Sequence, residues 1–231
     1  MTTGVALAAI ACLAASGFAA ACARGLGAAV ADRIGAGLVL AGATLGALSA
    51  GLALAGHGDA LVFPSSLPGG ALVVGVDALS ALFMLPVVVV AAACSVYSLE
   101  YFRASEYPRE AGRLRTAYGL ASAGLVLVLV ARHALVFLAG WEVMAIAAFF
   151  AVTADDRDRE VRDAGFLYLV CTRMSTLCLL ALFAVLWAAT GSLALVPAPA
   201  GQIPLELGWA RRHDWLRSQI FAPPPCPTRP A

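Results

Sequence analysis

The sequence predicts an all-α, polytopic transmembrane helix bundle of about six spans, and three observations support this. Of the 231 residues, 61% are hydrophobic and only 13% are charged, whereas soluble domains are about 45–50% apolar and about 25% charged. The mean hydropathy is +0.88. The apolar residues also fall into runs of roughly 20, the helix length that crosses a hydrocarbon core of ~30 Å. We therefore expect a multi-pass protein of the cell (inner) membrane.

Polar or Pro/Gly-rich segments separate six apolar runs, so residues 1–192 are expected to form one transmembrane bundle. His57–Gly70 is expected to be a short extramembrane loop, because it contains Pro64, Pro68 and two adjacent glycines. Asp77 opens the third span and is expected to cap that helix. The six spans are expected at about residues 4–22, 34–56, 76–97, 114–131, 135–153 and 164–190.

The arginines predict how the bundle is oriented in the membrane. All 15 basic residues are Arg, and cytoplasmic segments of membrane proteins carry an excess of basic residues. The connections after the second and fourth spans carry only Arg132, whereas those after the first, third and fifth spans carry nine arginines. The connections after the odd-numbered spans are therefore expected to be cytoplasmic and the N-terminus outside. The nine arginines are Arg24, Arg33, Arg103, Arg109, Arg113, Arg115, Arg157, Arg159 and Arg162.

Residues 193–231 form a Pro/Arg-rich tail that is expected to be irregular or to lie in the membrane interface. Eight of the 12 prolines of the chain fall in its last 35 residues, and proline interrupts helices. The charged run Arg211–Asp214 prevents a further span. Leu205–Phe221 has two tryptophans, a residue type that favours headgroup depth.

The composition argues against several classes of function. A formal net charge of +1 gives no reason to expect a nucleic-acid partner. None of the six cysteines forms a Cys-x-x-Cys motif or has metal-ligand spacing to a histidine, so they are expected to be small packing residues. No phosphate-binding loop or nucleophile elbow is present. We therefore expect no cofactor, no metal and no redox or hydrolytic centre in this chain itself.

Two opposite charges are expected near the middle of the membrane. At 1.5 Å per helical residue, Glu142 lies roughly 12 Å from the outer end of the fifth span, and Arg173 roughly 13.5 Å from the inner end of the sixth. A short connection joins these two spans, so they are expected to be neighbours. Because an isolated charge in lipid is costly, the sequence predicts a Glu142–Arg173 ion pair.

The charges and their depth are consistent with two interpretations of this pair. Glu142 is either a protonatable site in an ion path or one half of a structural pair that fixes helix register. Arg173 stays protonated at working pH, so it would modulate the charge of Glu142 but not relay protons. His133, at the outer end of the fifth span, is a weaker candidate for the point where protons enter. Such a histidine is more often a solvated interfacial residue.

Three stretches resemble the antiporter-like proton-translocating membrane subunits of complex I, cation/proton antiporters and membrane-bound hydrogenases. The most specific piece is the Trp-Glu-x-Met sequence beginning at Trp141, and the sixth span looks most like the B component of hydrogenase-4. The resemblance covers roughly Leu72–Ser192. The stretches are VDALSALFMLPVVVVAAACSVYSLEYF at Val76–Phe102, LVFLAGWEVMAIAAFF at Leu135–Phe150 and AGFLYLVCTRMSTLCLLALFAVLWAATGS at Ala164–Ser192.

The resemblance implies about fourteen helices, an outside N-terminus and a fifth helix whose Glu transfers protons, a position that Glu142 matches. It also implies a partner Lys on a broken seventh helix. This chain has no Lys, and it ends after six predicted spans. We therefore expect a truncated or frameshifted product, or one half of a split subunit.

The leading hypothesis is a membrane subunit, or a fragment of one, in a proton-translocating oxidoreductase complex. Glu142 would be its proton-transfer site. The implied partners are the other membrane subunits of a hydrogenase-like or complex I-like (NADH-quinone oxidoreductase) assembly, the lipid bilayer and no nucleic acid. The alternative is a non-transporting scaffold that docks to partner chains through its Gly/Ala-rich helices. A self-contained membrane enzyme has little support, because the chain has no motif for one.

Overall fold

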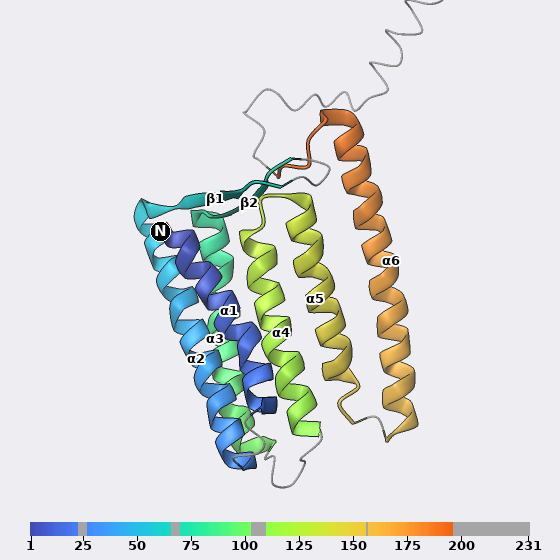
Figure 1. The fold of residues 1–231 in the computed structure, drawn as a ribbon. Helices are drawn as coiled ribbons and strands as arrows, with labels where there is room; N and C mark the ends of the chain where they lie inside the picture. Colours follow the sequence, from blue (N-terminus) through green and yellow to red (C-terminus); the bar gives the residue numbers. More distant parts are fainter. Residues whose placement is uncertain (23–26, 66–69, 103–109, 156, 196–231) are drawn as a thin grey trace, which may run out of the picture.

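The computed structural model of the chain describes residues 1–22, 27–65, 70–102, 110–155 and 157–195. In these residues, six long helices form a bundle and a β-hairpin lies across one end of it (Figure 1). All six helices are long and apolar enough to cross a membrane, which confirms the predicted fold class. The elements are α1 (Thr2–Cys22), α2 (Ala28–Leu52) with a π-helical turn (Ala53–His57), β1 (Asp59–Phe63), β2 (Leu72–Val76), α3 (Ala78–Tyr101), α4 (Glu110–Val130), α5 (Ala134–Val152) and α6 (Arg159–Thr190).

Several helices extend beyond the apolar runs from which the spans were predicted. Helix α4 begins at Glu110 and α6 at Arg159, before the predicted starts at residues 114 and 164. The Asp158 side chain caps α6 by accepting a hydrogen bond from the Glu160 N–H at 3.0 Å. Charged residues continue a helix readily once it is capped. Hydropathy therefore locates the membrane-spanning part of a helix better than its ends.

The loop predicted over His57–Gly70 contains a β-strand, so that expectation was wrong in part. Strand β1 pairs antiparallel with β2 in a register that joins Asp59 to Val76 and Phe63 to Leu72. Because Val76 belongs to β2, α3 begins at Ala78 and not at residue 76. Both strands are short apolar runs, which hydropathy does not distinguish from the ends of neighbouring spans.

The hairpin belongs to a longer backbone ladder that crosses this end of the bundle. The connection between α4 and α5 pairs with β2 through a Val74–Ala131 bridge, and the Arg132 N–H donates to the Val73 carbonyl at 3.0 Å. Residues 193–195, which follow α6, pair with the same connection, with the Leu195 N–H donating to the Arg132 carbonyl at 2.8 Å. The ladder therefore ties α6 to the other helices. The remainder of the predicted tail, residues 196–231, lies outside the described residues.

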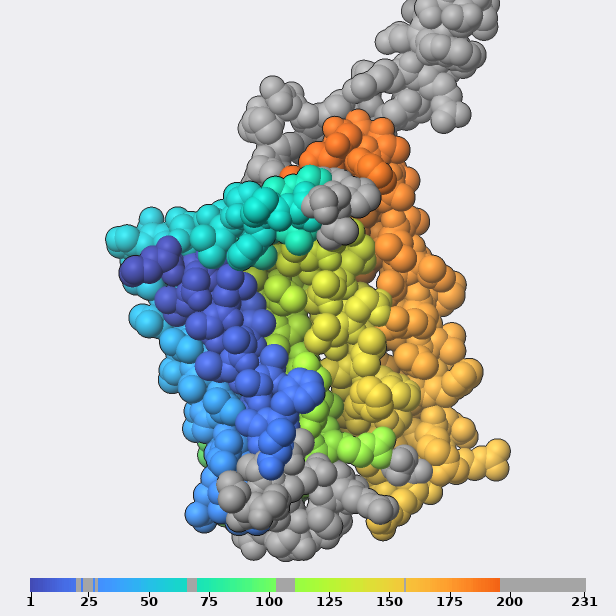
Figure 2. Space-filling model, in the orientation of Figure 1, coloured from blue at the N-terminus to red at the C-terminus, as the bar shows by residue number. Residues whose placement is uncertain are grey.

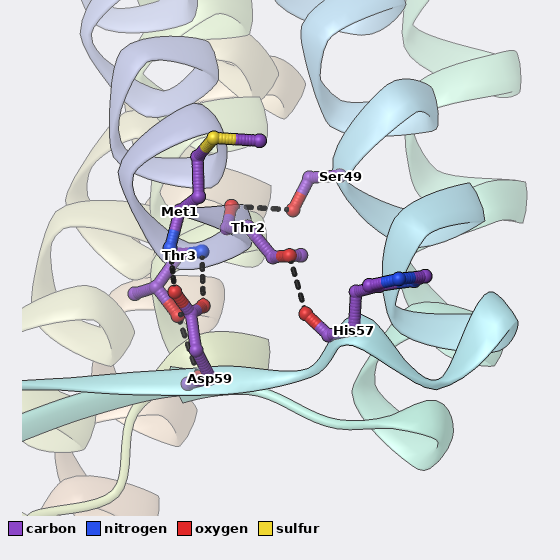
Figure 3. Close-up of polar contacts among 6 residues, drawn as sticks. All are labelled: Met1, Thr2, Thr3, Ser49, His57 and Asp59. Atoms are coloured by element: carbon purple, nitrogen blue, oxygen red, sulfur yellow. Dashed lines mark hydrogen bonds and ion pairs between the residues drawn. The ribbon is translucent and has the colours of Figure 1, made fainter.

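The hairpin also holds the first turn of α1, as Figure 3 shows. Asp59 accepts hydrogen bonds from both the backbone N–H of Thr3, at 2.6 Å, and its hydroxyl, at 2.7 Å. The Thr2 hydroxyl donates to the His57 carbonyl at 2.5 Å, and the Ser49 hydroxyl donates to the Thr2 carbonyl at 3.0 Å. Asp59 therefore satisfies backbone donors that the start of a helix leaves open.

The main core lies among α1, α2, α3 and α4 and consists of small and aliphatic side chains. Its largest fully buried side chains are Leu13, Met84, Val88, Val126 and Val130, all at most 1% exposed. Small residues bring these helices close together, as is common in membranes. A Cβ atom on Gly17 of α1 would lie 2.4 Å from the Thr116 Cα atom of α4, so only glycine fits there.

Helices α5 and α6 extend the bundle on one side (Figure 1). Helix α5 packs closely on α4, because a Cβ atom on Gly124 would lie 2.9 Å from the Gly140 carbonyl oxygen. Helix α6 packs against α5, and Phe183 joins Ala134 and Leu193 in a small buried cluster near the ladder. Most of the remaining α6 surface is exposed and apolar. The predicted midplane pair lies between these two helices.

Candidate functional site

Glu142 and Arg173 occupy the middle of adjacent helices. Glu142 is the ninth of the 19 residues of α5, and Arg173 is the fifteenth of the 32 residues of α6. The Arg173 Nη1 atom contacts the Glu142 Oε2 atom as an ion pair, and the two side chains are 41% and 29% exposed. The ion pair predicted from membrane depth is therefore present.

Thr176 binds the second carboxylate oxygen of Glu142, and this residue was not predicted from the sequence. Its hydroxyl donates to the Glu142 Oε1 atom at 2.6 Å. Thr176 follows Arg173 by three residues, a spacing that puts both side chains on the same face of α6. This spacing was the only signal in the sequence, and it is weak because threonines inside helices commonly hydrogen-bond to their own backbone.

The Thr176 hydroxyl has two alternative acceptors. Besides Glu142, it lies 3.1 Å from the Thr172 carbonyl oxygen. A hydroxyl has one hydrogen to donate and two lone pairs that accept. It can therefore donate to an ionised Glu142. Alternatively, it can donate to the Thr172 carbonyl while accepting a hydrogen bond from a protonated Glu142. The site thus accommodates both protonation states of the acid without a change in the backbone.

Three buried nitrogen atoms around the pair have no acceptor among the described residues. They are the Nε and Nη2 atoms of Arg173 and the Nε1 atom of Trp141, the residue before the acid. A buried donor without an acceptor costs about 1–3 kcal/mol. The guanidinium thus makes one bond to the acid and retains further donors beside it.

His133 lies at the opposite end of α5 from the connection to α6 and is not part of this constellation. It is the N-cap residue of α5, where its Nδ1 atom accepts a hydrogen bond from the Leu135 N–H at 3.2 Å. The residue is 1% exposed, so the expectation of a solvated interfacial histidine was wrong. Its burial follows from the backbone ladder, in which His133 pairs with Ala194. Nine residues of helix, or roughly 13 Å, separate it from Glu142.

Asp77 caps α3 as predicted and also binds a basic residue. Its Oδ1 atom accepts from the Ser80 N–H at 2.7 Å, and its Oδ2 atom lies 2.8 Å from the Arg132 Nη2 atom. Partial burial opposes ionisation of Asp77. The Ser80 hydrogen bond and the Arg132 charge outweigh it, so the pKa of this carboxyl lies below its ordinary value.

A second charged pair lies inside the bundle, and the sequence analysis did not predict it. Arg115 of α4 contacts Asp32 of α2, and their side chains are only 12% and 13% exposed. The Arg115 Nη2 atom also donates to the Phe102 carbonyl at 3.1 Å. The pair was missed because Arg115 was assigned to the boundary of its span, whereas α4 begins five residues earlier. It links α2, α4 and the end of α3.

Comparisons with known proteins give the fold a context. No family model matches the chain. Two uncharacterized proteins of Mycobacterium tuberculosis, from strains CDC 1551 / Oshkosh and ATCC 25618 / H37Rv, are each 34% identical over 127 residues, which is 54% of this chain and 19% of the relative. This chain thus matches about a fifth of the length of those relatives.

The fold is similar to a chain of the membrane-bound sulfane sulfur reductase, an archaeal respiratory membrane complex. The TM-score is 0.65 and the identity is 18%, and the match covers 82% of this chain and 38% of that chain. The two chains therefore share a fold over most of the present sequence. The protein is a multi-pass membrane protein with the helix arrangement of a respiratory-complex chain.

Proposed function

We propose that this chain is a membrane subunit of an ion-translocating respiratory complex, in which Glu142 takes up and releases a proton. The observation that carries the proposal is an acid in the middle of an apolar helix long enough to cross a membrane, held between Arg173 and Thr176. Intramembrane acids commonly serve ion pathways. The fold shared with a respiratory-complex chain supports the same class of protein, as does the Trp-Glu-x-Met resemblance. The finer assignment, to a hydrogenase-4-like or complex I-like assembly of the inner cell membrane, rests on that resemblance.

The transported species in this proposal is a proton and not a metal cation. A cation bound at Glu142 would lie beside the Arg173 guanidinium, which repels it at short range. A proton instead converts the carboxylate to a neutral acid. The new O–H then donates to the Thr176 hydroxyl, whose own hydrogen turns to the Thr172 carbonyl. Release of the proton reverses these steps and restores the full ion pair with Arg173.

Arg173 acts in this proposal as a fixed positive charge. Arginine does not lose its proton in proteins, so it stabilises the ionised acid without relaying protons. Redox chemistry belongs to partner chains, which would be other membrane subunits of the assembly. In this proposal, residues of those partners form the proton path on either side of Glu142.

For His133 we propose a structural role in place of proton uptake. Its Nδ1 atom accepts the Leu135 N–H and so caps the first turn of α5. The capping geometry therefore supports a structural role for His133 at the start of this helix.

The test is proton flux in membrane vesicles that contain the assembled complex. Glu142→Gln keeps the size of the side chain but cannot exchange a proton, and we expect flux per assembled complex to fall to the background of vesicles without the complex. The matched control is Glu160→Gln, which removes an exposed acid from the first turn of α6 and should leave flux unchanged.

Immunodetection of the assembled complex separates transport from assembly. If Glu142→Gln lowers the amount of complex but leaves flux per complex unaltered, the pair is structural and the chain is a scaffold, as in the alternative hypothesis. If both amount and flux are unchanged, Glu142 has neither role.

A further inference from the structure

A partly enclosed cavity of about 300 Å³ lies among α1, α2, α3 and α4, away from the Glu142 site. It is near the helix ends opposite the hairpin, beside the last turns of α3 and the first turns of α4 (Figure 1). Figure 2 shows the face of the bundle formed by α1 in blue, α4 in green and α5 in yellow, and α3 lies behind that face. The cavity volume is at the lower end of the range for small-molecule sites, about 300–1,000 Å³.

The cavity is mostly apolar, and the one basic residue that lines it is already paired. Arg115 contacts Asp32 through its Nη1 atom, and its Nη2 atom donates to the Phe102 carbonyl at 3.1 Å. Both terminal nitrogens of the guanidinium are therefore engaged within the protein. Because no lining residue carries an uncompensated charge, the cavity favours a neutral molecule over an ion.

Ser95 of α3 gives the cavity a hydroxyl that is not used elsewhere in the described part of the chain. The residue lines the cavity and is 5% exposed, and its hydroxyl has no hydrogen-bond partner among the described residues. A serine in a helix commonly donates to the carbonyl four residues earlier, which here is that of Ala91. That oxygen accepts the Tyr118 hydroxyl at 3.1 Å, in addition to the backbone N–H of its own helix. The Ser95 hydrogen therefore remains available to a ligand.

Ser95 differs in this respect from the other two serines that line the cavity. The Ser16 hydroxyl donates to the Leu13 carbonyl at 2.7 Å, and the Ser98 hydroxyl donates to the Ser95 carbonyl at 2.8 Å. Each of these hydroxyls therefore has its one hydrogen engaged inside its own helix. The free hydrogen of Ser95 fits a carbonyl oxygen, because a carbonyl group accepts a hydrogen bond and brings no donor of its own into the apolar cavity.

Two stacked tyrosines stand where the cavity opens to the membrane. Tyr97 and Tyr101 line it and are 64% and 66% exposed, and their ring centroids lie 5.2 Å apart with 23° between the ring planes. Both belong to the last turns of α3, a helix long and apolar enough to cross a membrane, and tyrosine is common at this boundary depth. A molecule can therefore enter from the bilayer and pack a ring against these aromatic side chains.

We propose that this cavity binds a neutral, membrane-soluble planar ring that carries a carbonyl group, the chemistry of a quinone head group. The ring would lie among α2, α3 and α4 beside Tyr97 and Tyr101, and one carbonyl oxygen would accept the Ser95 hydrogen. A second carbonyl group or an apolar tail would face the open side of the cavity. The site is separate from Glu142 and does not depend on the role proposed for that residue.

Isothermal titration calorimetry of the full chain in phosphatidylcholine nanodiscs tests the proposal, with empty nanodiscs as the background for partition into lipid. The probes are dimethylnaphthoquinone, whose methyl groups prevent the addition of cysteine thiols, and dimethylnaphthalene, which has the same rings without carbonyl groups. We expect saturable binding of the quinone, about fivefold tighter than binding of the hydrocarbon, a factor typical of one hydrogen bond.

Removal of the Ser95 hydroxyl tests the hydrogen bond. Ser95→Ala should lower the affinity for the quinone about fivefold and leave the affinity for the hydrocarbon unchanged. The matched control is Ser49→Ala, which removes a buried hydroxyl from the hairpin end of α2 and should keep the preference for the quinone.

A second pair of variants tests whether the ring lies in the cavity. Ala36→Leu fills the cavity, and Ala121→Leu fills a neighbouring hollow of about 360 Å³ between α3 and α4. We expect Ala36→Leu to abolish saturable binding of both probes and Ala121→Leu to preserve it. Circular dichroism of each variant checks that the helices are intact.

Several results would overturn the proposal. The native chain could bind the two probes equally, or no more than empty nanodiscs do. Ser95→Ala and Ser49→Ala could change the preference equally, or Ala36→Leu could leave binding unchanged. Native mass spectrometry adds a further test with the same variant. A phospholipid that stays bound to the native chain but not to Ala36→Leu, and that the quinone does not displace, would assign the cavity to a lipid and overturn the proposal.

Discussion

A carboxylate inside a bilayer persists when each of its oxygens has a partner, and Glu142 meets this condition with two residues of α6. Arg173 takes one oxygen and Thr176 takes the other, at 2.6 Å. The sequence predicted the ion pair, because charge and depth alone require a compensating group. It could not predict Thr176, because a hydroxyl inside a span has a default acceptor in its own helix. Thr176 is identified only by the position of its hydroxyl beside the Glu142 carboxylate.

Replacing Thr176 tests its contribution to the site. Thr176→Val keeps the shape of the side chain but leaves the Glu142 Oε1 atom without its donor. A hydrogen bond to a charged group contributes about 1.5–3 kcal/mol, so we expect proton flux per complex to fall by about tenfold or more. Thr176→Ser restores the hydroxyl and should keep flux within about twofold of the native value. Equal flux in Thr176→Val and the native chain would exclude a role for the hydroxyl.

The lowered pKa of Asp77 predicts how the stability of the hairpin end of the bundle depends on pH. Its pKa is lowered from an ordinary value of 3.8, so its interactions with Ser80 and Arg132 stabilise the folded state above that pH. This stabilisation is lost as the pH falls through the lowered pKa. We expect Asp77→Asn to reduce the thermal unfolding midpoint near pH 6 and to flatten its decline below about pH 4. Parallel curves for the two proteins at all pH values would contradict this assignment.

At the scale of elements, apolar runs predicted the six helices but not what joins them. The hairpin of β1 and β2 was missed because the prolines and glycines between its five-residue strands mark that segment as a loop, and because β2 is as apolar as the span that follows it. The ladder that β2 forms with residues 131–133 and 193–195 is a non-local pairing, and no local pattern encodes it. The Asp32–Arg115 pair is also non-local, since it joins two helices through residues 83 positions apart. It was missed in addition because Arg115 was assigned to the boundary of its span and not to its interior.

The Asp32–Arg115 pair is expected to stabilise the packing of α2 on α4. Asp32→Asn leaves the Arg115 charge buried without a counter-charge, so we expect a loss of about 3 kcal/mol in the free energy of unfolding in detergent. A double variant with Arg115→Gln should recover part of that loss. The matched control is Asp163→Asn, because the Arg159–Asp163 pair is highly exposed and should change stability by less than about 1 kcal/mol. Equal effects of the two single substitutions would contradict the buried pair.

For the whole molecule, the described residues form a core of four helices onto which α5 and then α6 are added. Hydropathy predicts the number of spans but not this order of packing, because lipid-facing and helix-facing side chains are equally apolar. The outward face of α6 is broadly exposed and apolar. The chain matches only 38% of the respiratory-complex chain whose fold it shares.

The most direct test of the central claim is infrared difference spectroscopy of the assembled complex during turnover. If Glu142 takes up and releases a proton, the native complex should show a carboxylic acid C=O band that appears and decays with the cycle. This band should be absent in Glu142→Gln, present in Glu160→Gln and shifted in frequency in Thr176→Val, because the acid loses its hydrogen-bond partner. A native spectrum with no such band, or a band that persists in Glu142→Gln, would contradict the account and leave Glu142 as a structural partner of Arg173.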